Sequence, residues 1–243
     1  MSAEDTGTVE VTRDGEVAVV TLRRERKRNA LSTHMENELL AALRSPEVES
    51  SRAVVVTGGD TVFSAGADVT ELRDMTTQAI ADYYRGSGAV YEVFGALRQP
   101  TVVAITGYCL GGGLELALAA DIRIADPAAA FGFPEIGIGI LPSSGGVTRI
   151  VRIAGAGRAR DLVLRGRRFD ARQAEQWGIV TEITAPGEHI KQATAIAREL
   201  AAYSPLAMSI TKQVLDVSLD APREAALLLE QLAYSVLNNQ ETK

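Results

Sequence analysis

Two glutamates occupy segments that are otherwise apolar or rich in glycine. Glu115 ends the sequence GGGLE at residues 111–115, and Glu135 ends FGFPE at residues 131–135. A carboxylate without a partner is costly to remove from water, so a glutamate in such surroundings usually has a partner or a chemical task. Two carboxylates of this kind could serve as general acid and general base on one reacting group.

A third segment, FSAGAD at residues 63–68, could supply a backbone N–H group to the same reaction. Its small side chains let another group approach the backbone closely, and glycine permits strained turns. The N–H of Ala67 would then form half of an oxyanion hole for a carbonyl oxygen. The alternative is an ordinary turn between a strand and a helix, with Asp68 as the helix N-cap.

The three glycines at residues 111–113 lie between an expected buried strand and an expected helix. They leave the backbone bare where the helix starts, and the free N–H groups and positive potential there suit a developing oxyanion. Close packing of the helix on the sheet is a strong alternative explanation for Gly111 and Gly113. It does not explain Glu115 in the first helical turn.

The surroundings of Glu135 are apolar. Phe131, Phe133 and Pro134 describe a hydrophobic wall, which should raise the pKa of the Glu135 carboxyl toward neutrality and make it a useful acid. The alternative is a surface glutamate on a loop, and the low polarity of its neighbours weighs against it.

Strands that alternate with helices should position these segments in an α/β fold. Strands at 9–12 and 17–23 are expected to form a hairpin, and THME at residues 33–36 fits a capping box that opens a helix ending near residue 43. Residues 107–113 should form a turn. The other expected strands are 53–57, 101–106, 121–125 and 180–183, and the other expected helices are 76–97, 113–120, 146–153, 156–165, 170–177, 188–203, 205–218 and 222–237.

Composition narrows the class of protein. The chain has 243 residues, of which 46% are hydrophobic and 23% charged, as in a globular protein with a sizeable core. No apolar stretch reaches the roughly 18 residues of a membrane helix, and residues 1–8 do not look like a signal peptide. The single cysteine, Cys109, excludes an internal disulfide, and His34 and His189 have no metal-ligand spacing. We therefore expect a cytoplasmic protein without a metal.

Charge is unevenly distributed. The net charge of −6 argues against a general nucleic-acid-binding protein. However, a dense basic stretch follows the second expected strand, at Arg23, Arg24, Arg26, Lys27 and Arg28. It is either a solvated turn or a docking site for a polyphosphate ligand.

The three segments, at this order and spacing, resemble the crotonase, or enoyl-CoA hydratase/isomerase, superfamily. The resemblance covers nearly the whole chain, including RNALS at residues 28–32 and ADIRIA at residues 120–125. It implies a spiral of ββα turns followed by a C-terminal helical region that forms homotrimers, or hexamers that are dimers of trimers. Residues 1–190 would form the spiral core and residues 191–243 the helical region. The implied substrate is an acyl-CoA thioester, with no other cofactor.

The resemblance also implies roles for individual residues. The backbone N–H groups of Ala67 and Gly112 match the oxyanion hole of the family, and Glu115 and Glu135 match the two catalytic glutamates of its hydratases. The residues that match the segments around CoA and the acyl group are Arg26, Arg28, Ala30, Ala65, Ala67, Asp68, Val69, Thr70, Leu110, Gly111, Gly112, Phe133 and Pro134.

The chain departs from the family pattern at three places. Phe133 stands where many hydratases have a polar residue, Glu25 replaces a frequent proline, and the sequence ends at Lys243, where the family usually continues into a last helix. We expect these departures to affect the acyl pocket and its lid more than the chemistry.

The presence of both glutamates favours hydration of a trans-2-enoyl-CoA to a 3-hydroxyacyl-CoA, which is a hydro-lyase reaction. An alternative within the same fold is isomerisation of the double bond, with Glu135 as the proton shuttle. An alternative of another class is a scaffold without catalysis that binds RNA or a protein partner. Loss of the enoyl-thioester absorbance of crotonyl-CoA would separate an enzyme from such a scaffold.

Overall fold

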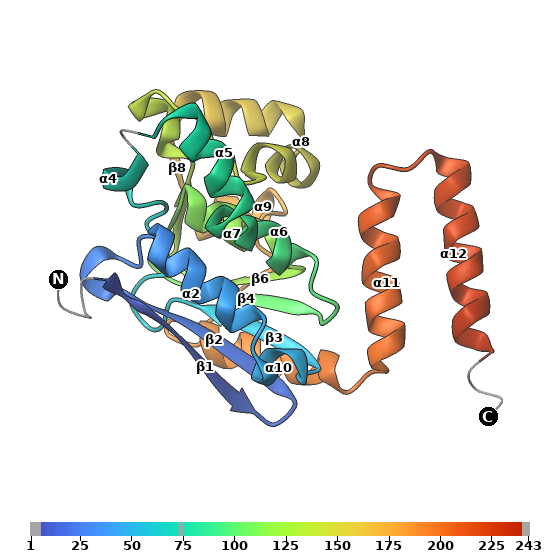
Figure 1. Cartoon of the computed structure of the whole chain (residues 1–243). Coiled ribbons are helices and arrows are strands. Elements are labelled where there is room, and N and C mark those ends of the chain that lie inside the picture. Colours follow the sequence, from blue (N-terminus) through green and yellow to red (C-terminus); the bar gives the residue numbers. More distant parts are fainter. Residues whose placement is uncertain (1–5, 73–74, 240–243) are drawn as a thin grey trace.

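A six-stranded sheet forms the centre of the computed structural model, which describes residues 6–72 and 75–239 (Figure 1). The strand order is β1-β2-β3-β4-β6-β9. β1 and β2 are antiparallel, which confirms the expected hairpin, and all other neighbours are parallel. The strands are β1 (Thr8–Asp14), β2 (Val17–Arg23), β3 (Ala53–Thr57), β4 (Thr101–Ile105), β6 (Ile122–Ala125) and β9 (Glu182–Ile183).

A second, smaller layer is built from β5 (Tyr108–Leu110), β7 (Ala130–Gly132) and β8 (Arg168–Asp170). Isolated bridges from Leu31 to Ala67 and from Ser64 to Cys109 continue this layer toward the N-terminal turns. The chain therefore alternates between the large sheet and the small layer, which is the spiral that the resemblance implies. The expectation of a turn over 107–113 is wrong at β5, because a strand of three residues is too short to show a periodic pattern.

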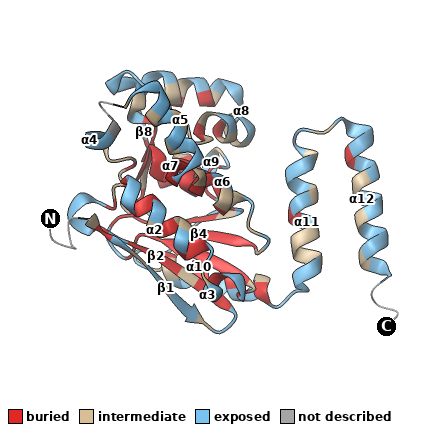
Figure 2. Cartoon of the chain, viewed as in Figure 1, coloured by how far each residue is buried: buried red, intermediate tan, exposed pale blue. Residues whose placement is uncertain are grey.

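The valine-rich strands β3 and β4 are buried along their whole length. Val54 and Val56 belong to the larger core, with α2 (Thr33–Leu43), α6 (Val90–Gly95) and α7 (Gly112–Ala119), whereas Val55 faces the smaller core under α10 (His189–Ala201). Such burial of both faces is typical of parallel strands that helices cover on each side. The strands and α7 accordingly form the buried centre in Figure 2.

The helix expected over residues 76–97 is broken into three pieces. α5 (Thr77–Arg85) ends at Gly86, η2 (Ser87–Ala89) is a single 3-10 turn, and α6 follows it. Gly88 has a packing reason as well, because a Cβ there would lie 2.7 Å from the Tyr83 ring. Gly86 and Gly88 therefore interrupt the helix, and Gly88 leaves room for Tyr83 to pack over the 3-10 turn.

The cap of α2 also differs from expectation. Ser32, rather than Thr33, is the N-cap, and its hydroxyl accepts a hydrogen bond from the Met35 N–H. The expected capping box is therefore wrong. Glu36 lies inside the helix and points into the protein, where it is 1% exposed.

The helices from residue 146 onward follow the expected pattern closely. α8 (Gly146–Arg165) is interrupted at Gly155, whose φ of 77° and ψ of 156° are not helical, so the two helices expected at 146–153 and 156–165 are confirmed as two segments. α9 (Ala171–Gln176), α11 (Pro205–Ser218) and α12 (Arg223–Asn238) also match expected helices. Four short helices that the structure describes are not among the expected ones, namely η1 (Glu25–Lys27), α3 (Pro46–Glu49), α4 (Val69–Leu72) and η3 (Pro134–Ile138). Among the described residues, no helix combines the length and apolar character of a membrane span.

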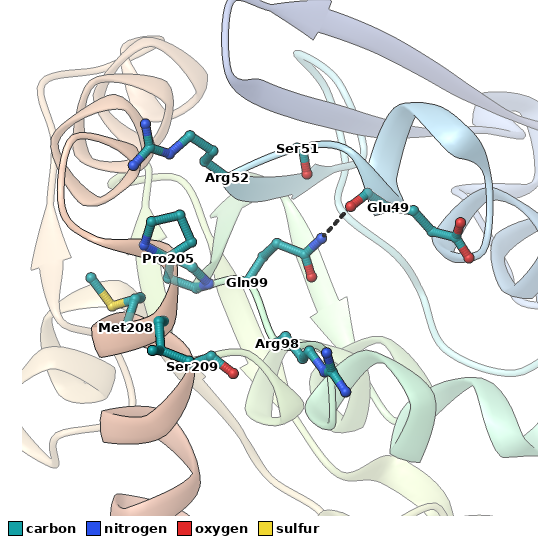
Figure 3. Close-up of a pocket in the computed structure, with 10 residues that line it drawn as sticks. Glu49, Ser51, Arg52, Arg98, Gln99, Pro205, Met208 and Ser209 are labelled. Atoms are coloured by element: carbon teal, nitrogen blue, oxygen red, sulfur yellow. Dashed lines mark hydrogen bonds between the residues drawn. The ribbon is translucent and has the colours of Figure 1, made fainter. Parts of the chain in front are cut away.

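α11 and α12 pack on each other and extend away from the rest of the chain (Figure 1). Most of their surface is exposed (Figure 2). At their base, Lys212 Nζ lies 2.9 Å from Asp121 Oδ2, and Arg52 donates to the Tyr203 carbonyl. A pocket lies at this junction beside Gln99 and Pro205 (Figure 3), and no candidate site residue lines it. The division of the chain at residue 190 stays a prediction.

Candidate active site

The N–H groups of Ala67 and Gly112 come from two loops in close contact. A Cβ at Gly112 would lie 3.4 Å from the Ala67 nitrogen, and one at Gly66 would lie 3.3 Å from the Gly112 nitrogen. Neither N–H group donates to an acceptor among the described residues. Two free donors therefore lie close together at the first residue of α7, where helix geometry leaves an N–H without a partner.

The strand-like bridge to Leu31 explains why the Ala67 N–H is free. Leu31 donates to the Gly66 carbonyl at 2.8 Å, and Asp68 donates to the Leu31 carbonyl at 2.9 Å. In this parallel bridge, Leu31 makes both hydrogen bonds with the two neighbours of Ala67, not with Ala67 itself. The Ala67 N–H is therefore left without a bond to Leu31. The φ of 97° at Gly66 requires glycine, because other residues rarely adopt it.

Glu115 lies in the first turn of α7 and is 4% exposed. Its Oε1 accepts hydrogen bonds from the N–H groups of Ser144 at 2.7 Å and Gly146 at 2.9 Å. Burial raises the pKa of this carboxyl, and the two N–H groups and Arg149 oppose the rise. The loop before α8 thus holds one oxygen of Glu115, while no described residue donates a hydrogen bond to Oε2.

Glu135 lies in η3 beside the glycine loop. Burial, and then the charge of Glu115, raises its pKa from 4.5 to about 7. A Cβ at Gly111 would lie 2.7 Å from Glu135 Oε1, so glycine is required for this approach. Oε2 of Glu135 is buried and has no hydrogen-bond partner among the described residues. The structure therefore brings together both glutamates and both N–H groups.

The two explanations for the glycine run apply to different residues. Gly111 and Gly112 make room for Glu135 and for the Ala67 N–H, respectively. Gly113 serves packing instead, because a Cβ there would lie 2.8 Å from both Cβ and O of Ser64. Phe133 is fully buried, with its ring 3.0 Å from the position of a Cβ at Gly146. It therefore forms a wall next to Glu115.

The cations of the basic stretch lie in two different environments, because Arg24 is buried and the others are exposed. Arg24 is buried, and its Nη1 lies 2.9 Å from Asp68 Oδ2 and 3.0 Å from the Ala30 carbonyl. Asp68 also accepts a hydrogen bond from the Thr70 hydroxyl. Arg24 and Asp68 thus join the two loops, which no charge pattern along the sequence could indicate. The remaining cations, on and beside η1, are exposed: Arg23, Arg26, Lys27 and Arg28.

The other residues expected around CoA occupy varied environments. Ala65 donates its N–H to the Arg28 carbonyl at 2.9 Å, which aligns the two loops. Leu110 is buried, Val69 and Pro134 are exposed, and Ala30 is half-buried. Cys109 is buried in β5, and burial raises the pKa of its thiol, as expected of a core residue.

One charged residue of this region is absent from the sequence-based candidates. Glu36 accepts hydrogen bonds from the hydroxyls of Tyr83 at 2.7 Å, Ser87 at 2.9 Å and Tyr91 at 2.9 Å. The available signal was its position on the apolar face of α2, three and seven residues before Leu39 and Leu43. A carboxylate on that face requires buried partners.

Comparisons with known proteins show the family of this chain. The family model described as enoyl-CoA hydratase/isomerase matches residues 12–243. The short-chain-enoyl-CoA hydratase of Clostridium acetobutylicum is 34% identical over 224 residues, covering 91% of this chain and 86% of that protein. YngF of Bacillus subtilis, which carries an enoyl-CoA hydratase/isomerase name, is 37% identical over 220 residues, covering 90% of this chain and 85% of that protein.

Solved structures show the same fold. A crystal structure of enoyl-CoA hydratase subunit I from Geobacillus kaustophilus HTA426 has a TM-score of 0.90 at 32% identity, and the match covers 96% of this chain and 91% of that chain. The fold expected from the sequence is therefore confirmed. The chain belongs to the enoyl-CoA hydratase/isomerase family and has the fold of the crotonase superfamily.

Proposed function

We propose that the protein adds water to a trans-2-enoyl-CoA and forms a 3-hydroxyacyl-CoA. One observation carries the proposal: around one glycine loop lie two N–H groups and two carboxylate oxygens that have no hydrogen-bond partner in the part of the chain that the structure describes. The N–H groups belong to Ala67 and Gly112, and the oxygens are Oε2 of Glu115 and of Glu135. Hydration needs both kinds of group, because it requires an activated carbonyl and two proton transfers.

The N–H groups would hold the thioester oxygen. Hydrogen bonds from Ala67 and Gly112 draw electrons from the conjugated double bond and make its C3 carbon electrophilic. As water adds, negative charge moves onto the thioester oxygen, where the two donors stabilise it. Each such donor typically contributes about 10²–10³ in rate.

The two glutamates would move the protons. Glu115, ionised and held through Oε1, binds the water through Oε2 and takes one of its protons while the oxygen bonds to C3. Glu135 delivers a proton to C2, and the proton gained by Glu115 then restores Glu135. Two carboxyls that share one water titrate together, so these roles belong first to the pair.

The pH dependence should show this pair. Glu135 acts in its protonated form, and its pKa of about 7 means that this form is lost as pH rises through about 7. Glu115 acts ionised, so its form is lost on the acid side. We expect kcat/KM for crotonyl-CoA, measured from about pH 5 to 9, to fall above about pH 7 and also at low pH. A flat profile between about pH 6 and 8 would contradict these assignments.

Exposed apolar side chains on elements that carry or adjoin the site residues could accept the acyl chain. They are exposed on α4, α5, η3 and the following loop, at Val69, Ile80, Tyr84, Ile136, Ile140 and Leu141. The Tyr84 hydroxyl contacts the Ser143 hydroxyl at 2.5 Å, which brings α5 against the loop that holds Glu115. Arg26 and Arg28 are our candidates for the phosphates of CoA, for which guanidinium groups are well suited.

The substitution Gly146→Ala tests the position of Glu115. The added methyl would lie 2.7 Å from both Cγ and Oε1 of Glu115 and 3.0 Å from the Phe133 ring, so the carboxylate must move. We expect kcat for crotonyl-CoA to fall about 10²-fold, as small misplacements of catalytic groups can cause, with little change in acyl-CoA affinity. Gly157→Ala is the matched control, because it lies in the same helix and its Cβ would meet no atom within 4 Å. Equal kcat in the two variants would contradict the proposal.

Isomerisation remains the second candidate, because a carboxyl with a pKa of about 7 also suits a proton shuttle. Absorbance of the conjugated enoyl thioester separates the reactions. We expect trans-2-enoyl-CoA esters of several chain lengths to lose absorbance and 3-enoyl-CoA esters to show no gain. A gain from the 3-enoyl esters alone would support the isomerase. No change with any ester would contradict both reactions and favour the scaffold without catalysis.

A homotrimer, or a hexamer of two trimers, remains our proposal for the assembly. Exposed apolar side chains along α11 and α12, and at the residue that follows α11, support it, namely Leu215, Leu219, Leu228, Leu232, Tyr234 and Val236. Apolar surface of this kind is commonly covered by another protein surface.

A further inference from the structure

Glu36 lies outside the proposed catalytic pair, and yet three hydroxyl groups hold its carboxylate. Oε1 accepts from Tyr83 and Tyr91, and Oε2 accepts from Ser87. These donors come from α5, α6 and η2, the three pieces of the broken helix. A single carboxylate on α2 therefore fixes the relative position of all three pieces.

The Tyr91 hydroxyl lies beside the proposed oxyanion hole. Tyr91 is 1% exposed, and its Oη lies 3.0 Å from the position that a Cβ at Gly112 would take. The Ala67 nitrogen lies 3.4 Å from that same position. The Tyr91 hydroxyl, held by Glu36, thus borders the place where the two N–H donors meet.

Tyr83 and its neighbour Tyr84 link Glu36 to the loop that holds Glu115. Burial raises the pKa of Tyr83, and the side chain of Ser144 opposes this rise. The Ser144 N–H in turn donates to Glu115 at 2.7 Å. The neighbouring residue, Tyr84, contacts Ser143 in the same loop. Glu36 is therefore linked to both halves of the site, each time through one tyrosine.

We propose that Glu36 is a positioning residue for hydration, which fixes Gly112 through Tyr91 and the Glu115 loop through Tyr83. The inference rests on the proposed function. Without Glu36, the hydroxyls of Tyr83 and Tyr91 would lose their shared acceptor, and buried polar groups without partners are unfavourable enough to move. Both the oxyanion hole and the catalytic base would then lose support.

The charge of Glu36 gives this role a signature that packing alone would not give. After burial, which is the largest cause, the charge of Glu36 contributes to raising the pKa of Glu115. Removing that charge should therefore lower the pKa of Glu115. The groups that face Glu36 are Tyr83, Ser87, Tyr91, Glu71 and Glu115. The groups that face Glu115 are the N–H groups of Ser144 and Gly146, together with Arg149, Glu36, Tyr91 and Glu135.

Three variants test the proposal by kcat and KM for crotonyl-CoA. We expect Glu36→Leu to lower kcat about 10²-fold and Tyr91→Phe about tenfold, with KM nearly unchanged, because displaced catalytic groups affect the chemical step. Glu36→Gln should retain kcat within about threefold, because the amide still accepts from the tyrosines and can donate to Ser87. The acid limb of the kcat/KM profile of Glu36→Gln should move to lower pH.

Thr101→Val is the matched control. The Thr101 hydroxyl is fully buried and lies 2.8 Å from the carboxylate of Asp121, so the variant also loses a buried hydroxyl–carboxylate bond, but outside the site. Wild-type kcat in this control, at a loss of Tm similar to that of Tyr91→Phe, is the expected result. Equal kcat in Tyr91→Phe, Glu36→Gln, Thr101→Val and wild type, with an unmoved acid limb in Glu36→Gln, would overturn the proposal even if Glu36→Leu does not fold.

Binding of acetoacetyl-CoA gives a readout that does not depend on turnover. In its enolate form, acetoacetyl-CoA carries on its thioester oxygen the negative charge that crotonyl-CoA develops only in the transition state, so Tyr91→Phe should weaken its binding about tenfold relative to Thr101→Val. Equal affinity in the two variants would contradict the positioning role. A wild-type protein that binds acetoacetyl-CoA but hydrates no enoyl-CoA would contradict the proposed function instead.

Discussion

Glu115→Gln and Glu135→Gln are each expected to lower the kcat for crotonyl-CoA hydration by about 10²–10⁴-fold, the usual contribution of one general acid or base. The glutamine side chain has the same shape, but it neither takes a proton from water nor delivers one to carbon. Affinity for acetoacetyl-CoA should change little, because the N–H groups of Ala67 and Gly112 remain. Steady-state kinetics and calorimetric titration measure the two effects. Near-normal hydration by either variant would contradict the roles of the pair.

The thermal stability of Glu135→Gln tests whether the variant loses activity without losing stability. The folded protein holds the pKa of Glu135 at about 7 instead of 4.5, so between these pH values it binds more protons than the unfolded chain. Its stability therefore falls as pH rises through this window. The glutamine variant lacks this loss, and its Tm at about pH 8 should equal or exceed that of the wild type. A lower Tm there would mean that the carboxylate has stabilising partners.

Gly112→Pro is expected to lower kcat by about 10²–10³-fold, because it deletes one N–H group of the proposed oxyanion hole. Gly112 is the first residue of α7, and proline is well tolerated at the first position of a helix. The ring would occupy the space that the thioester oxygen needs near the Ala67 N–H. The measurement is kcat/KM for crotonyl-CoA, with the circular dichroism spectrum as the test of folding.

Gly112→Ala separates the lost donor from the added bulk. Its Cβ would lie 3.0 Å from Tyr91 Oη and 3.4 Å from the Ala67 nitrogen, but it keeps the N–H group. We expect its kcat/KM to lie between those of the wild type and Gly112→Pro. Equal activity of the alanine and proline variants would mean that crowding, and not the Gly112 N–H, accounts for the loss.

The main elements could be predicted because their signals are local, and signals of the same kind singled out the loops in which we propose the site. Runs of valine mark the buried strands β3 and β4, and helical spacing marks α11 and α12. Glycine runs and lone glutamates in apolar company mark the loops that carry Ala67, Gly112, Glu115 and Glu135. Each of these features depends on residues that are close in sequence, where periodicity and desolvation are informative.

The features that were missed depend on contacts between distant residues. β5, β7 and β8 have three residues each, and strands this short are defined by their neighbours. Likewise, Arg24 and Asp68 form an ion pair across 44 positions, so the sequence alone did not separate Arg24 from the exposed cations beside it. Glu36 looked like part of a capping box because its hydroxyl partners lie 47 to 55 positions away.

The most direct measurement follows crotonyl-CoA in water labelled with a heavy isotope of oxygen. Hydration predicts a product heavier than the substrate by one molecule of labelled water, together with loss of the enoyl-thioester absorbance. The glutamine variants of Glu115 and Glu135 should leave the substrate largely unconverted. A product of unchanged mass, or release of free CoA thiol without a hydroxyacyl-CoA product, would contradict hydration by this pair.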